Sequence, residues 1–235
     1  MAEYSGDRET SHQDNAPMLI DHWPLLGLRL NTGHLELRLP ASEELSDLAD
    51  LAAEGMHHPG SRPFLVSWPG RAPKDRARAL VQRHWQDRGD WSTSNWSLAL
   101  AVFADGQVVG QQDISARDYP VLREVSTFSW LGVRHHGKGI GTQMRAAALH
   151  LAFAGLGATD ATSGAFDDNI SSLRVSEKLG YQPDGIERLA AHGQVTTTRR
   201  LRLTRHQWES TDRPPVTITG LAPCLPMFGL PADGR

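Results

Sequence analysis

The sequence has a single cysteine, Cys224, among its 235 residues. One thiol cannot form an internal disulfide, and it leaves no cysteine cluster for a zinc site. The adjacent histidine pairs at 57–58 and 135–136 lack a third ligand. No apolar run approaches the ~18 residues that a membrane-spanning helix needs, and residues 1–15 are polar and acidic, unlike a signal peptide. These absences predict a soluble, cytoplasmic protein with no membrane partner and no bound metal.

Neither sign of charge is in large excess, because 24 Lys and Arg stand against 27 Asp and Glu, a net charge of −3. A nucleic-acid-binding protein needs a basic footprint, so we expect no nucleic-acid partner. The length suits one domain of roughly 180–200 residues with tails. We expect a disordered N-terminal tail over residues 1–22, the domain over 23–208 and a proline-rich C-terminal extension over 209–235.

The C-terminal extension is too apolar for a free tail. Between positions 221 and 230 it carries Leu221, Leu225, Met227, Phe228 and Leu230. Leaving such side chains in water costs free energy. We therefore expect the extension to pack on the domain's own surface, or on a neighbouring subunit of a homo-oligomer.

Hydrophobic periodicity predicts a mixture of helices and strands. Ser42 and Asn169 are candidate helix N-caps, and Asp105-Gly106 is a hairpin-turn signal. A three-stranded antiparallel meander is therefore predicted over residues 97–133. Strand patterns occupy residues 34–39, 97–103, 107–115, 124–133, 161–166, 195–203 and 216–218. Helical patterns occupy residues 42–55, 75–88 and 169–179, and a further one begins at the glycines of 137–141 and ends at 155.

Three alternating glycines, Gly137, Gly139 and Gly141, lie between a predicted strand and a predicted helix. Glycines at this density let backbone N–H groups converge on an anion at a helix N-terminus. The nucleotide-binding pattern GxxxxGK[ST] fails, because Gly139 stands where Ser or Thr is needed. The pattern GxGxxG fails as well, because its third glycine would be Thr142. The alternative is a plain strand-to-helix turn that needs positive φ.

Residues 136–141 (His-Gly-Lys-Gly-Ile-Gly) resemble motif A, [QR]xxGx[GA], of the GNAT superfamily of acyl-CoA N-acyltransferases, with His136 in place of Gln or Arg. The resemblance implies an α+β fold, in which a strongly bent, mainly antiparallel sheet carries helices on both faces. It also implies that this loop binds the pyrophosphate of coenzyme A through its backbone amides. The residues implied are His136, Gly137, Lys138, Gly139, Ile140, Gly141 and Thr142.

A second segment supports this resemblance. Residues 169–172 (Asn-Ile-Ser-Ser) and 177–181 (Glu-Lys-Leu-Gly-Tyr) are similar to the NxxS…EKxGF pattern of the RimJ/RimL-type branch, which acetylates protein N-terminal amines. Residues 32–39 are similar to that branch's opening strand, TxRLxLR. The resemblance covers about residues 23–208. With the extension around 223–229, the chain is most similar to actinobacterial members, some of which are labelled succinyl-CoA transferases.

The family pattern implies roles for further residues. The backbone of Leu131 and Val133 would contact the pantetheine arm of coenzyme A. Many members present a tyrosine to the coenzyme sulfur, but Ser176 occupies that position here. Ser172 is then the candidate acid or hydrogen-bond donor to the departing thiolate. Asn169 would cap its helix and also contact the coenzyme.

The general base is less clearly indicated. The glutamate of the RimJ/RimL branch aligns with Ser126, so Glu124, two residues earlier on the same strand face, is the candidate base acting through a water. Trp68 and Trp91 lie in predicted loops and are candidates to line the acceptor site.

The resemblance implies direct transfer of an acetyl or other short acyl group from acyl-CoA to a primary amine, within a ternary complex. The acceptor stays open: a protein N-terminus, a lysine or a small molecule. One alternative is a succinyl-CoA-dependent N-succinyltransferase, for which Arg62, Arg71 and Lys74 could bind the distal carboxylate. The other is a non-catalytic acyl-CoA-binding domain, suggested by the missing tyrosine and the displaced glutamate.

Overall fold

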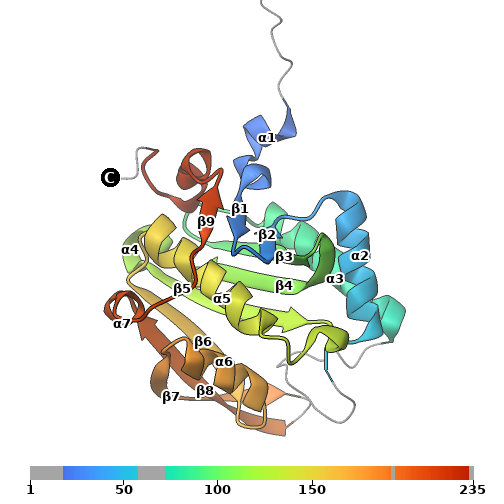
Figure 1. Cartoon of the computed structure of the whole chain (residues 1–235), viewed down its shortest axis with the longest axis vertical. Helices are drawn as coiled ribbons and strands as arrows, with labels where there is room; N and C mark the ends of the chain where they lie inside the picture. The colour runs from blue at the N-terminus through green and yellow to red at the C-terminus, as the bar shows by residue number, and fades with distance from the viewer. Residues whose placement is uncertain (1–17, 58–71, 192–193, 233–235) are drawn as a thin grey trace, which may run out of the picture.

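The computed structural model describes residues 18–57, 72–191 and 194–232. Nine strands form one open sheet in the order β7-β8-β6-β5-β4-β3-β2-β1-β9. Neighbouring strands are antiparallel, except β5 and β6, which are parallel. Helices cover both faces of the sheet (Figure 1). The predicted α+β fold with a mainly antiparallel sheet is therefore confirmed.

The strands are β1 (Arg29–Asn31), β2 (Leu35–Arg38), β3 (Trp96–Ala104), β4 (Gln107–Ala116), β5 (Glu124–Leu131), β6 (Asp160–Phe166), β7 (Gln182–Ala191), β8 (Gln194–Thr204) and β9 (Thr217–Thr219). The α-helices are α1 (Leu19–His22), α2 (Ser42–Glu54), α3 (Pro73–Gly89), α4 (Tyr119–Leu122), α5 (Ile140–His150), α6 (Ile170–Lys178) and α7 (Arg205–Glu209). Helix α5 continues through one π-helical turn, Leu151–Gly155. None of the helices in the described ranges is long and apolar enough to span a membrane.

The predicted meander of β3, β4 and β5 is confirmed. Asp105 and Gly106 have φ of 50° and 77°, the left-handed pair that a tight hairpin needs. The cap predicted at Ser42 is wrong by one residue. Helix α2 begins at Ser42, and the preceding Ala41 N–H donates to the Glu44 side chain at 2.8 Å. The single exposed turn α1 lies inside the range predicted as tail, and residues 1–17 are outside the described part of the chain.

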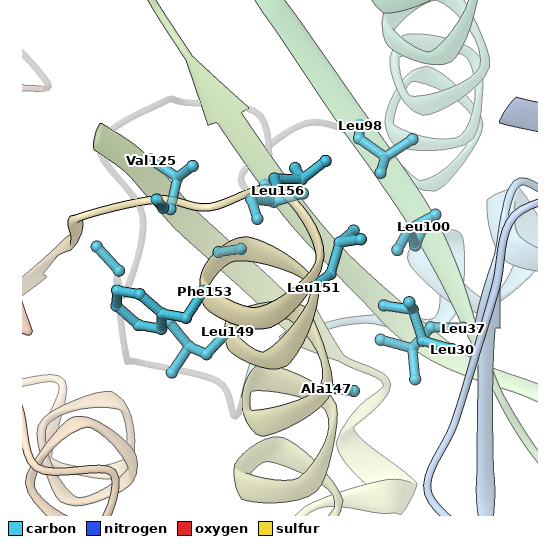
Figure 2. Packing of buried hydrophobic residues seen from close by; sticks show 14 of the residues in the cluster. Leu30, Leu37, Leu98, Leu100, Val125, Ala147, Leu149, Leu151, Phe153 and Leu156 are labelled. Carbon is cyan, nitrogen blue, oxygen red and sulfur yellow. The ribbon is translucent and has the colours of Figure 1, made fainter. Parts of the chain in front are cut away.

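Two layers of helix pack on the sheet. Helix α5 lies over one face, where Leu98 and Leu100 of β3 pack toward Ala147 and Leu151 (Figure 2). Helices α2 and α3 lie over the other face, where a smaller cluster contains Trp130 of β5. Each fully buried leucine stabilises the fold by about 1.5–3 kcal/mol. Successive side chains of a strand point to opposite faces of the sheet. The odd-numbered residues of β5 therefore lie on the α5 face, and the even-numbered ones, which include Trp130, lie on the α2/α3 face.

The C-terminal extension packs on its own domain, one of the two predicted outcomes. Strand β9 pairs with β1 in antiparallel register, with Ile218 opposite Leu30. Phe228 is fully buried, and the Trp91 indole N–H donates to Met227 O at 2.9 Å. Because Trp91 belongs to this aromatic cluster, the expectation that it lines the acceptor site is wrong. Trp68 lies outside the described residues.

Candidate active site

An opening in the centre of the sheet lies between β5 and β6. The two strands pair over only three positions, from Glu124↔Asp160 to Ser126↔Thr162. Beyond these, β5 stays paired with β4 as far as Leu131, and β6 stays paired with β8 as far as Phe166. The two strands therefore diverge from Thr127 onward, and the divergence opens toward the start of α5 (Figure 1).

Backbone groups of β5 point into this opening. Thr127 O accepts from Ser163 Oγ of β6 at 3.5 Å, whereas Gly132 N–H donates to Val109 O at 3.1 Å, on the opposite side. Backbone groups of successive strand residues alternate between the two neighbours. Ser129 and Leu131 therefore direct their N–H groups toward β6, where the ladder has ended.

Of the two predicted pantetheine contacts, Leu131 lies in the opening and Val133 does not. Val133 N–H donates to Gly55 O at 3.3 Å, and its carbonyl accepts from His136 N–H at 3.1 Å, so both of its backbone groups are engaged. Ser129, rather than Val133, is the second residue whose backbone N–H is directed into the opening. Strand alternation is the signal that could have found it, because Ser129 is in phase with Leu131.

The glycine loop closes the wide end of the opening. Gly137 and Gly139 have φ of 74° and 77°, and a Cβ built on either one meets no atom of the described residues within 4 Å. Gly139 is the N-cap of α5, whose first N–H groups lack intrahelical partners. The loop therefore combines free donors with a surface that leaves room for a closely approaching ligand.

The side chains around the glycine loop differ in whether other protein groups already engage them. His136 donates its ring N–H to Leu131 O at 3.1 Å, which ties the loop to β5. Arg134 is ion-paired with Glu54, whereas the exposed Lys138 forms no ion pair with any described residue. Thr142 N–H donates to Gly139 O at 3.1 Å, which leaves its hydroxyl as the group that can reach a ligand.

Helix α6 borders the opening from the α5 side. Asn169 caps it as predicted, because its Oδ1 accepts from Ser172 N–H at 3.2 Å. The same oxygen accepts from Ser171 Oγ at 3.0 Å. Ser172 is half-buried in the first helical turn. Ser176, at the position of the family's tyrosine, is 1% exposed.

Arg145 of α5 joins three elements at the opening, and sequence reasoning missed it. Its Nη1 donates to Ser176 Oγ at 2.9 Å and its Nη2 to Ser129 Oγ at 3.1 Å. The side chain is 4% exposed, its Nε has no partner, and no carboxylate of the described residues pairs with it. Burial lowers the pKa of this guanidinium. A buried cation without a counter-ion among the described residues is costly.

Glu124, the predicted base, lies away from these groups. It begins β5 where that strand is still paired with β6, five residues or about 16 Å along the strand before Ser129. Its carboxylate accepts from Arg202 Nη1 at 2.5 Å. Glu124 therefore forms an ion pair at the end of β5 where the two strands are still paired. It does not lie near the other candidate residues.

The comparisons with known proteins agree with this geometry. Residues 34–182, more than half of the chain, match the model of the acetyltransferase (GNAT) domain. This chain belongs to the GNAT acetyltransferase family. It is therefore an enzyme of the acyl-CoA-dependent transferase class.

Solved structures share the fold of this GNAT domain. RimJ of Mycobacterium smegmatis in complex with CoA-disulfide is 18% identical, with a TM-score of 0.57 over 78% of this chain and 92% of that one. The ribosomal-protein-S5-alanine acetyltransferase of Vibrio fischeri is 16% identical, with a TM-score of 0.60 over 77% and 98%. A microcin self-immunity acetyltransferase with bound acetyl-CoA and AMP is 16% identical, with a TM-score of 0.56 over 73% and 93%.

Proposed function

We propose that this chain transfers an acetyl group, or another short acyl group, from acyl-CoA to a primary amine. The observation that carries the proposal is the divergence of β5 and β6 beside the glycine loop, with the N–H groups of Ser129 and Leu131 directed into it. The likeness to proteins named RimJ and ribosomal-protein-S5-alanine acetyltransferase makes a protein N-terminus the first acceptor to test. Lysines and small amines are the other acceptor classes.

The loop fits the pyrophosphate of coenzyme A. Gly137 and Gly139 leave free the space that a Cβ would fill, and the N-terminus of α5 favours an anion there. The N–H groups of residues 137–141 would hold the phosphate oxygens, with the Lys138 ammonium and the Thr142 hydroxyl beside them. Leu131 would pair with an amide of the pantetheine arm.

The remaining residues act on the reacting atoms. Bound acyl-CoA supplies the activated thioester carbonyl, and the Ser129 N–H is directed to polarise it. The amine nitrogen forms the new C–N bond while the C–S bond breaks, and Ser172 donates to the departing thiolate. Asn169 orients the turn that carries Ser172. The transfer is direct, since Cys224 is fully buried and burial raises its pKa to about 11.

A panel assay tests the function. The purified full-length chain is incubated with acetyl-CoA and peptides that begin with Ser or Ala, a blocked lysine peptide, and a polyamine. We expect one acetyl group on one amine class by mass spectrometry, with one free coenzyme thiol released per transfer. Coenzyme A binding without transfer to any amine would favour the non-catalytic alternative instead.

Ser172→Ala should lower kcat by about 30- to 1,000-fold and leave coenzyme affinity nearly unchanged. A donor that strengthens its contact as charge develops on sulfur acts mainly in the transition state. Steady-state kinetics and calorimetric titration of coenzyme A measure the two effects. Ser171→Ala is the matched control, because within the described ranges the side chain of this exposed neighbour bonds only to Asn169. Wild-type kcat in Ser172→Ala, or a proportional loss of coenzyme affinity, would contradict the role.

A donor that carries a distal carboxylate, such as succinyl-CoA, is the second candidate. The observation that favours it is Arg145, a buried cation beside Ser129 with no acidic partner among the described residues. The thioester would lie next to Ser129, so its acyl group is the nearest source of an anion. Of the cations predicted for this purpose, Lys74 is exposed on α3, and Arg62 and Arg71 lie outside the described residues.

Arg145→Met should separate the two donors. If a distal carboxylate binds Arg145, kcat/KM for succinyl-CoA falls about 100-fold, because a buried charge loses its partner. Activity with acetyl-CoA should change by less than about threefold, since Met has a similar volume and replacing a buried ion by an apolar residue is tolerated. Lys74→Met is the control for the loop cation. Equal losses with both donors would remove Arg145 from donor selection.

A further inference from the structure

On the face of the sheet opposite α5, exposed side chains lie where β5 leaves β6. Ser126 and Phe128 of β5 point to this face and are exposed, with 43% of Phe128 accessible to solvent. The next residue on the same face, Trp130, is buried under α2 and α3. Since the coenzyme is proposed to lie on the α5 face, this exposed patch is a route by which an amine can reach the opening.

Asp113 of β4 stands beside this open patch. It pairs directly with Phe128 across the β4–β5 ladder, so the two side chains are neighbours on one face. Its Oδ1 accepts from Gln111 Nε2 at 2.6 Å, and no described residue donates to its Oδ2. Asp113 is half-buried, so the second oxygen remains within reach of a ligand or a water.

A buried chain of hydrogen bonds fixes this carboxylate. His84 of α3, 2% exposed, donates its ring N–H to Gln111 Oε1 at 3.0 Å. Burial lowers the pKa of His84 to about 4, so the ring is neutral and one of its nitrogens carries this proton. The Gln111 amide is thereby oriented with its NH₂ group toward Asp113. This arrangement holds the Asp113 carboxylate in place on β4.

The charges around Asp113 suit a base that works near neutral pH. Burial raises the pKa of the Asp113 carboxyl to about 7, and the nearby Asp87 carboxylate adds to this rise. The hydrogen bond from Gln111 and the Arg83 guanidinium both lower the pKa and so oppose it. Asp87 and Arg83 pair on α3 at 2.8 Å. The flanking strands contribute no ionisable side chain, because Ala99 and Phe128 occupy the paired positions. A base is most effective when its pKa lies near the working pH.

We infer that Asp113 is the general base of the proposed acyl transfer, and that the amine enters over Phe128 from the face opposite the coenzyme. The inference rests on the proposed function. A primary ammonium gives one proton to Asp113 Oδ2, directly or through one water, and its freed electron pair forms the C–N bond. The C–S pair leaves on the coenzyme sulfur, toward Ser172, and the second proton that the nitrogen loses on becoming an amide converts this thiolate to the free thiol. The proton on Asp113 then passes to solvent across the open face.

Asp113→Asn tests the inference, because it keeps the shape of the side chain and removes the base. We expect kcat at saturating amine to fall about 100- to 1,000-fold, with coenzyme affinity unchanged. In the wild type, kcat should rise with pH through a midpoint near 7, as the carboxyl loses its proton. This rise should be absent from Asp113→Asn. A variant with wild-type kcat and the same pH profile would overturn the assignment.

Two further variants sharpen the test. Gln111→Met removes the hydrogen bond that lowers the Asp113 pKa, so the midpoint of kcat should move to higher pH, a shift that a purely structural role would not produce. Glu124→Gln tests the competing carboxylate. If Glu124→Gln abolishes the pH-dependent rise and Asp113→Asn retains it, the inference is wrong. Absence of transfer by the wild type would instead overturn the proposed function itself.

Discussion

Gly139→Val is expected to weaken coenzyme A binding by about 1,000-fold or more. A side chain at this position would enter the space in which the pyrophosphate is proposed to lie, which no atom from the described part of the chain occupies. Displacing the pyrophosphate removes several charge-assisted hydrogen bonds, each worth about 1.5–3 kcal/mol. Titration calorimetry with coenzyme A measures the loss of affinity.

Gly106→Val controls for backbone strain in that experiment. Gly106 also has φ of 77° and open space at its Cβ, but it lies in the turn between β3 and β4, away from the loop. A β-branched residue in this conformation costs roughly 1–3 kcal/mol at either position. Both variants should therefore lose stability, and only Gly139→Val should lose the coenzyme. Unchanged affinity in Gly139→Val would exclude the loop as a phosphate site.

Phe228→Ala is expected to lower the free energy of unfolding by about 3–5 kcal/mol. Phe228 is fully buried, and its ring meets Trp91 and Trp96 edge-on with centroids 5.5 and 4.9 Å away. Truncation would remove these contacts and leave a cavity among rings from the extension, β3 and the loop after α3. For a chain of this length, the midpoint of thermal unfolding should fall by roughly 6–20 °C.

Urea denaturation of both proteins measures this effect, and Ile186→Ala is the control. Ile186 is 67% exposed on β7, so its truncation should change stability by less than about 0.5 kcal/mol. If Phe228→Ala unfolds at the wild-type urea concentration, the extension does not contribute to the core. The proposal that it belongs to one cooperative unit with the domain would then fail.

Local chemistry explains why much of the fold is predictable from the sequence. The meander could be predicted because side chains alternate along its strands and Asp105-Gly106 accepts the left-handed conformations of a tight turn. The start of α6 is predictable for a similar reason, since Asn169 satisfies an N–H of its own first turn. Such signals depend only on neighbours in the sequence.

Strand β7 illustrates what local signals miss. It contains Pro183 and Gly185, both unfavourable in strands, and its pairing with β8 shifts register between Pro183 and Ile186. Only the long ladder offered by β8 makes this segment a strand, and its position at the edge of the sheet tolerates the proline. Strand β1 is equally dependent on its neighbours, because its three residues lie between β2 and β9.

The candidate site also contains one part that depends on sequence neighbours and another that depends on long-range contacts. The glycine loop could be predicted from the sequence, because its chemistry resides in consecutive backbone groups between one strand and one helix. Ser129, Arg145 and Asp113 could not be combined from the sequence, because they come from different elements and are placed around the same part of β5 only when α5 and β4 pack against that strand. Glu124 shows the converse: its spacing suggested a role, but it starts the strand, and tertiary pairing with Arg202 holds it at the closed end. The sequence alone thus determined the fold class and the glycine loop between its strand and helix. Tertiary packing decided which side chains lie around the opening between β5 and β6, since long-range contacts set those distances.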